Sequence, residues 1–154
     1  MNLESYDLRV NQAQTVYMFD SIGRNGHITK IIGFNAINMP ELEPLGFVSV
    51  YNLGFGDYDR VTGLISDTVK SNNGDRDKVL ATVATAALDF LDKHSDLILY
   101  ATGSTPERTR LYQIGLNRYY AQLENAYLIF GLSAEGWQTF EQKTNYKAFL
   151  LKRK

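Results

Sequence analysis

The stretch DRDKVLATVATAALDFLDK, residues 75–93, decides the fold because the hydrophobic pattern changes its period there. One face carries, at helical spacing, Val79, Val83, Ala86, Ala87 and Phe90. Such a stripe predicts an amphipathic helix that packs on a hydrophobic core. We expect Asn73 or Asp75 to cap its N-terminus, since short polar side chains accept hydrogen bonds from the first helical N–H groups.

After this helix, the sequence alternates strands with one further helix. Leu97–Ala101 is a short apolar run typical of a buried strand. A second helix is predicted over Pro106–Leu123, because Tyr112 and later apolar residues recur at helical spacing and proline suits the first helical position. Residues 127–132 and 146–152 then form the two last strands.

The residues before position 75 are predicted to form strands, because they are rich in β-branched and aromatic side chains separated by turn signals. The expected strands are Thr15–Asp20, His27–Asn35, Phe47–Leu53 and Gly63–Lys70, with a turn over residues 54–60 between the last two. The complete order predicts an α+β fold with a mixed, largely antiparallel sheet and two main helices. We interpret residues 1–154 as a single domain.

Composition narrows the classes of function. A net charge of −1 offers no overall field that would attract nucleic acid, so any anion site must be local. The absence of cysteine excludes disulfides, zinc-thiolate sites and thiol nucleophiles. No segment has the apolar length of a membrane span or the pattern of a secretory signal, and we expect a cytoplasmic protein with no membrane partner.

The start of the second helix, GSTPER, has the residue types of an anion site. Gly103 permits a sharp turn and close approach to the backbone, and Ser104 and Thr105 supply hydroxyls. A phosphate or carboxylate is stabilised at a helix N-terminus by free N–H groups and the helix dipole. Arg108 would face the crevice between helix and strand, and Arg110 would reach the anion from the side. The alternative is ordinary capping, with Arg108 paired to Asp75 or Asp77.

The start of the first helix, SNNGDRDK, offers a second set of polar groups. Asn73, Gly74, Asp75 and Lys78 could complete a ligand site with the other helix start. Its carboxylates would repel an anion, so they could instead pair with the arginines. We expect no metal site, because no carboxylate cluster has the spacing of metal ligands. A solvated, capped helix start is the simpler alternative.

Two motifs, NNGDRDKVLATVA at residues 72–84 and GSTPERTRLY at residues 103–112, resemble a family of small uncharacterised Bacteroidota proteins. The resemblance runs through nearly the whole sequence. It implies that both helix starts belong to one site, because the two motifs recur together in that family.

The order of elements also resembles the GNAT acyltransferases. That resemblance implies a site for acetyl-CoA or another acyl-CoA at the first glycine loop, and it implies that Tyr112 is the general acid that protonates the departing thiolate. The loop reads NNGDRD where GNAT proteins carry basic or neutral residues, and Thr105 and Arg108 replace a more usual Asn and Ala.

Our leading interpretation is therefore a GNAT-like protein with an anion-binding pocket at two helix N-termini, and an acyltransferase if it is an enzyme. The alternative is a non-catalytic regulatory or toxin–antitoxin-type module that binds a protein partner or a second copy of itself. In that case the same motifs would lock the two helix starts together.

Overall fold

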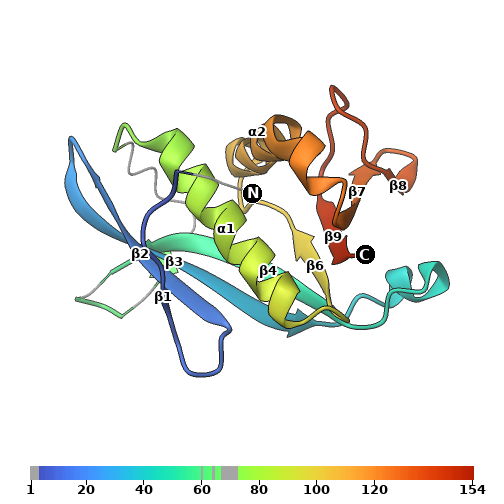
Figure 1. Cartoon of the computed structure of the whole chain (residues 1–154), viewed down its shortest axis with the longest axis horizontal. Helices are drawn as coiled ribbons and strands as arrows, with labels where there is room; N and C mark the ends of the chain where they lie inside the picture. Colours follow the sequence, from blue (N-terminus) through green and yellow to red (C-terminus); the bar gives the residue numbers. More distant parts are fainter. Residues whose placement is uncertain (1–3, 60, 64, 67–72) are drawn as a thin grey trace.

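The computed structural model describes residues 4–59, 61–63, 65–66 and 73–154. Within these residues, nine strands form one sheet, accompanied by two long helices and a short 3-10 helix (Figure 1). In sequence order the elements are β1 (Arg9–Val10), β2 (Val16–Gly23), β3 (Gly26–Ile37), η1 (Pro40–Leu45), β4 (Val50–Tyr58), β5 (Ile65–Ser66), α1 (Arg76–Lys93), β6 (Ile98–Ala101), α2 (Pro106–Leu123), β7 (Tyr127–Ser133), β8 (Gly136–Thr139) and β9 (Phe149–Arg153). The α+β prediction and its order of elements are confirmed.

The sheet has the order β1-β2-β3-β4-β6-β9-β7-β8, with β5 beside β4. Its strand pairs are antiparallel except for β4 and β6, which run parallel with Val50 opposite Ile98 and Leu53 opposite Ala101. A parallel pair needs a crossover connection, and α1 supplies it. The carboxyl ends of β4 and β6 therefore lie on the same side as the start of α2.

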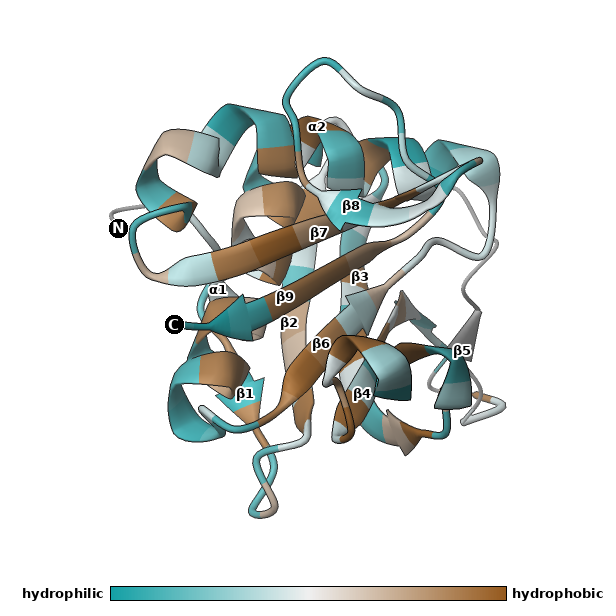
Figure 2. Ribbon diagram, turned by 90° about the vertical axis from the view of Figure 1, so that its right-hand side faces the viewer, coloured by the Kyte–Doolittle hydropathy of each residue, from teal (hydrophilic) through white to brown (hydrophobic). Residues whose placement is uncertain are grey.

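Both long helices cover one face of the sheet, where they close the main hydrophobic core (Figure 1). Phe90 of α1 stacks on Phe34 of β3 with ring centroids 4.2 Å apart, and neither side chain is more than 2% exposed. Strand β6 and most of β7 and β9 are strongly hydrophobic (Figure 2). Burial of this face orients α1 and α2 so that both N-termini lie toward the same end of the core.

A smaller cluster covers part of the opposite face. Leu42 of η1 is fully buried there against Val50, Ile98 and Leu150, whose side chains alternate with those that face the helices. Among the described residues, no helix is long and apolar enough to cross a membrane.

Both predicted helices and most predicted strands are confirmed within a few residues, but the predicted turn over residues 54–60 is wrong at its start. Residues 54–58 continue β4, because β3 pairs with that strand as far as Lys30 opposite Asp57. This long pairing outweighs the weak strand preference of two glycines. The reversal comes later, where the Gly63 N–H donates to the Asp59 carbonyl. Of the predicted return strand, Ile65–Ser66 pairs with β4, and residues 64 and 67–70 lie outside the described residues.

Candidate ligand cavity between the two long helices

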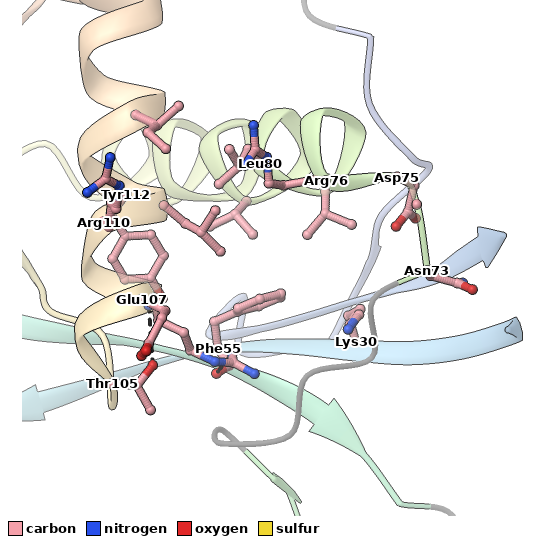
Figure 3. Close-up of a pocket in the computed structure, with 16 residues that line it drawn as sticks. Lys30, Phe55, Asn73, Asp75, Arg76, Leu80, Thr105, Glu107, Arg110 and Tyr112 are labelled. Atoms are coloured by element: carbon pink, nitrogen blue, oxygen red, sulfur yellow. Dashed lines mark hydrogen bonds between the residues drawn. The ribbon is translucent and has the colours of Figure 1, made fainter. Parts of the chain in front are cut away.

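A cavity of about 650 Å³ lies where the starts of α1 and α2 approach the inner face of β3 and β4 (Figure 3). It is lined by Lys30, Phe55, Asn73, Gly74, Asp75, Arg76, Val79, Leu80, Val83, Thr105, Glu107, Arg108, Arg110, Leu111, Tyr112 and Ile114. Its size falls within the range of small-molecule sites.

The different lengths of β4 and β6 create this space. The two strands pair only as far as Leu53 opposite Ala101. Beyond that point β4 continues to Tyr58, whereas the backbone after β6 turns into α2. Phe55 is the next inward-facing residue of β4 after Leu53, and its ring lines the cavity. The two helices therefore cover the space beside Phe55, and β5 pairs only with the last two residues of β4.

The cavity combines basic side chains with a largely apolar lining. Four basic side chains line it, Lys30, Arg76, Arg108 and Arg110, against two acidic ones, Asp75 and Glu107. Most of the remaining lining consists of aliphatic and aromatic side chains from α1, α2 and β4. Such a lining suits an organic anion that carries an apolar part.

Arg108 faces the cavity, as its helical spacing from Tyr112 predicted. Its Nη1 donates to the Phe55 carbonyl at 3.0 Å, and its guanidinium lies 5.2 Å from the centre of the Phe55 ring. Arg108 thus links α2 to the part of β4 that has lost its β6 neighbour. The acidic partners considered for it bind elsewhere: Asp75 accepts two hydroxyl hydrogen bonds, and Asp77 pairs with Arg118 at 3.1 Å.

A buried ion pair that sequence reasoning missed includes Lys30 of the cavity lining. Lys30 Nζ is 2.5 Å from Asp57 Oδ1, and the two side chains are 6% and 13% exposed. Lys30 shares the inward face of β3 with Ile32 and Phe34, and Asp57 shares that of β4 with Phe55. Charged residues at inward positions of two amphipathic strands were the signal that could have identified this pair.

Asn73, predicted as a ligand-binding residue, lines the cavity, but its side-chain amide is hydrogen-bonded to other residues of the protein. Its side chain is buried, and its Nδ2 donates to the Gly26 carbonyl at 2.9 Å and to the Ser21 hydroxyl at 3.1 Å. Its Oδ1 accepts from the Asn25 N–H at 2.6 Å. Asn73 therefore fastens the start of α1 to the β2–β3 hairpin. Gly74 follows it in the left-handed region, with φ of 78°.

Asp75 is the N-cap residue of α1, but its carboxylate makes no hydrogen bond to the helix amides. Its Oδ2 instead accepts from the hydroxyls of Tyr6 at 2.6 Å and Ser21 at 2.5 Å. Burial, followed by the hydrogen bond to Asp75, raises the pKa of Tyr6 above 10.0. Lys78, also predicted in the site, lies outside the cavity lining, and its Nζ is 4.4 Å from the centre of the Tyr6 ring.

The start of α2 is closed by its own residues. Thr105 Oγ1 accepts from the Arg108 N–H at 3.2 Å, and the Gly103 N–H donates to Thr109 Oγ1 at 2.9 Å. A Cβ atom at Gly103 would lie 2.4 Å from the Thr109 nitrogen. The first turn of α2 therefore packs directly against Gly103, and it fills the space in which a ligand could approach this glycine. Ser104 is exposed and absent from the cavity lining.

Arg110 and Tyr112, the remaining predicted site residues, both line the cavity (Figure 3). Arg110 is exposed, and Tyr112 is half-buried further along α2. Among the described residues, no group of three or more histidine, aspartate or glutamate side chains is arranged to hold a metal ion.

The fold and the cavity define a small α+β protein with a mixed sheet and a cavity lined by basic and apolar side chains. The protein belongs to a family of unknown function (DUF6934), whose sequence model matches residues 2–154. No curated protein and no solved structure matches it.

Proposed function

We propose that the protein is a divergent acyl-CoA-dependent acyltransferase that holds an anionic part of its ligand in the cavity between α1 and α2. The observation that carries this proposal is the position of the cavity. It opens where β6 ends and its parallel neighbour β4 continues, beside the start of the crossover helix, and basic side chains line it. Ligands of α/β-type folds bind at such carboxyl ends of strands. The order of elements, which resembles that of GNAT acyltransferases, supports the same function.

The residues present fit an acyl-CoA on two counts. The amides at the start of α1 have no side-chain cap, and N–H groups of that kind stabilise phosphate oxygens. Arg76, Arg108 and Arg110 would hold the phosphates, because their guanidinium groups bind phosphate through paired hydrogen bonds. The carboxylate of Asp75 would repel a phosphate, but it accepts hydrogen bonds from two hydroxyl groups. An acyl-CoA supplies an activated thioester.

Tyr112 is the residue that would move a proton. Its side chain lines the same cavity one helical turn after Arg108. A phenol hydroxyl can donate a proton to a leaving group held within hydrogen-bond reach. The guanidinium of Arg108, fixed on the Phe55 carbonyl, would position the ligand relative to that hydroxyl.

Isothermal titration calorimetry with acetyl-CoA and with free CoA tests this function. We expect Arg110→Ala to weaken binding by about tenfold, because one charge-assisted hydrogen bond to the ligand is lost. Arg110 is exposed, so its removal should leave the hydrophobic core unchanged. Arg9→Ala is the matched control, since Arg9 pairs with Asp20 on the edge of the sheet. Failure of both CoA species to bind the folded wild-type protein would overturn the proposal.

A second candidate is a non-catalytic module that binds a protein partner. The observation in its favour is that Asn73 and Gly103, both parts of the paired motifs, are engaged within the protein itself. Size-exclusion chromatography with light scattering tests for self-association. A stable dimer that binds neither CoA species would favour this function over acyl transfer.

A further inference from the structure

A second, apolar cavity extends from the basic one between α1 and α2. It has a volume of about 80 Å³ and shares Leu80, Val83 and Tyr112 with the larger cavity. Its other lining residues are Leu53, Ala84, Ala87, Leu88, Leu99, Ala101, Gly115, Leu116, Tyr119, Leu123, Phe149 and Leu151. Because α1 and α2 both begin at the basic cavity, this groove leads away from it along both helices.

The groove is almost free of polar groups. Its floor consists of inward-facing side chains of β4, β6 and β9, which are nearly fully buried, for example Leu99 at 1% exposed. Its walls come from the facing sides of α1 and α2, where Leu88, Leu116 and Tyr119 are only half-buried. A space with this lining is poorly suited to water, which needs polar partners, and it favours an aliphatic occupant.

Gly115 is the residue that keeps this space open. It lies in the interior of α2, where glycine is less favourable than alanine. It does not adopt a positive φ, and a Cβ atom placed on it would have no heavy atom within 4 Å apart from its chain neighbours and the backbone of its own helix. Neither backbone conformation nor close packing therefore requires glycine at this position. Its absent side chain leaves a gap in the α2 wall of the groove.

We infer that the apolar groove binds the aliphatic chain of an acyl ligand whose charged part lies in the basic cavity, so that the preferred ligands carry medium-length acyl groups. The inference rests on the proposed function for the charged part of the ligand. Two observations support the inference. The two cavities are continuous at Leu80, Val83 and Tyr112, and the charged side chains line only the larger one. A ligand with a short acyl group would fill the basic cavity alone.

Binding constants for acetyl-CoA, octanoyl-CoA and octanoate test this inference. We expect octanoyl-CoA to bind the wild-type protein at least about tenfold more tightly than acetyl-CoA, because each buried methylene strengthens binding by about fourfold. Gly115→Leu should remove this preference by filling the groove and leave acetyl-CoA binding unchanged. Gly115→Ala is the matched control and should keep most of the preference. Circular dichroism checks that each variant is folded, and Ala84→Leu fills the groove from α1 if Gly115→Leu does not fold.

The outcomes separate the two proposals. Equal binding of acetyl-CoA and octanoyl-CoA to the wild-type protein would overturn the groove inference and leave the acyltransferase proposal standing. Octanoate binding that is lost in the groove-filling variant, without binding of either CoA ester, would support the groove and overturn the CoA proposal. Failure of all three probes to bind would overturn both.

Discussion

The starts of α1 and α2 are similar in sequence but differ in how their polar groups are used. At the start of α2, backbone N–H groups are bound by side chains of the same segment. Thr105 accepts from the Arg108 N–H, and Thr109 accepts from the Gly103 N–H. The start of α1 is fastened from outside, because the side chains of Asn73 and Asp75 bind the β2–β3 hairpin and the N-terminal segment. Its first amides receive no side-chain cap.

This difference shows that residue types alone do not distinguish a closed helix start from an open one. Glycine and hydroxyl residues marked the start of α2 as the stronger anion site, yet there the backbone groups are bound by neighbouring residues. What α2 contributes to the cavity is its arginine side chains and Tyr112. The start of α1, whose acidic residues argued against an anion, presents amides that its own side chains leave uncapped, because Asp75 binds the hydroxyls of Tyr6 and Ser21.

The largest expected effect is that of Gly103→Ala, which tests the closed start of α2. The added Cβ would lie 2.4 Å from the Thr109 nitrogen and 2.6 Å from the Arg108 Cβ, so the first turn of α2 must shift. We expect the free energy of unfolding, measured by urea denaturation, to fall by about 3 kcal/mol. Gly115→Ala, in open space on the same helix, should raise it by about 0.5 kcal/mol. A neutral Gly103→Ala would show that α2 does not close over this residue.

Asn73→Ala tests the external fastening of α1. Removal of this buried amide takes away the hydrogen bonds that it makes with the Asn25 N–H and the Gly26 carbonyl, which are partly buried. We expect a loss of about 2 kcal/mol in the free energy of unfolding. Asn125→Ala, at an exposed asparagine, should change it by less than about 0.5 kcal/mol. Equal effects at the two sites would contradict a fastening role.

Thr105→Ala should have a smaller effect, because one capping hydrogen bond is lost at a helix end that water can reach. The expected loss is about 1 kcal/mol in the free energy of unfolding, and Thr105→Ser should recover most of it. Thermal or urea denaturation followed by circular dichroism measures both variants. If serine and alanine were equally destabilising, the hydroxyl would not be the stabilising group.

The smallest effect concerns the bond from Tyr6 to Asp75 at alkaline pH. Burial and this bond raise the folded-state pKa of Tyr6 above 10.0, so the folded protein holds the phenol proton more tightly than the unfolded state does. The stability it contributes is present in full below pH 10.0 and is lost as pH rises through the folded-state pKa. The difference in free energy of unfolding between the wild-type protein and Tyr6→Phe should therefore be smaller at about pH 11 than at about pH 8.

Other tyrosines do not obscure this measurement. Burial, then a hydrogen bond to an aspartate of α1, also raises the pKa of Tyr17 and, to about 12, that of Tyr127. Both residues are present in the wild-type protein and in Tyr6→Phe, so their titration cancels in the difference. A difference that stays constant with pH would contradict the assigned bond.

The hydrophobic period of the sequence determined the helices, most strands and the α+β order, because a repeat of 3.6 or 2 residues fixes which side chains one element can bury. It also placed Arg108 and Tyr112 on the face of α2 that lines the cavity, whereas Arg110, expected to reach the site only from the side, is also part of the lining. Only the tertiary structure decided that residues 54–58 extend β4, because the partner strand β3 lies more than 20 residues away in sequence.

The tertiary structure also decided which polar groups are already bound. The Lys30–Asp57 pair, the contacts of Asn73 with the β2–β3 hairpin and the closed start of α2 at Gly103 all depend on distances between atoms brought together by folding. A sequence determines local conformation through interactions between near neighbours. Whether a polar group faces a ligand cavity or another part of the protein depends on long-range packing, which no local pattern records.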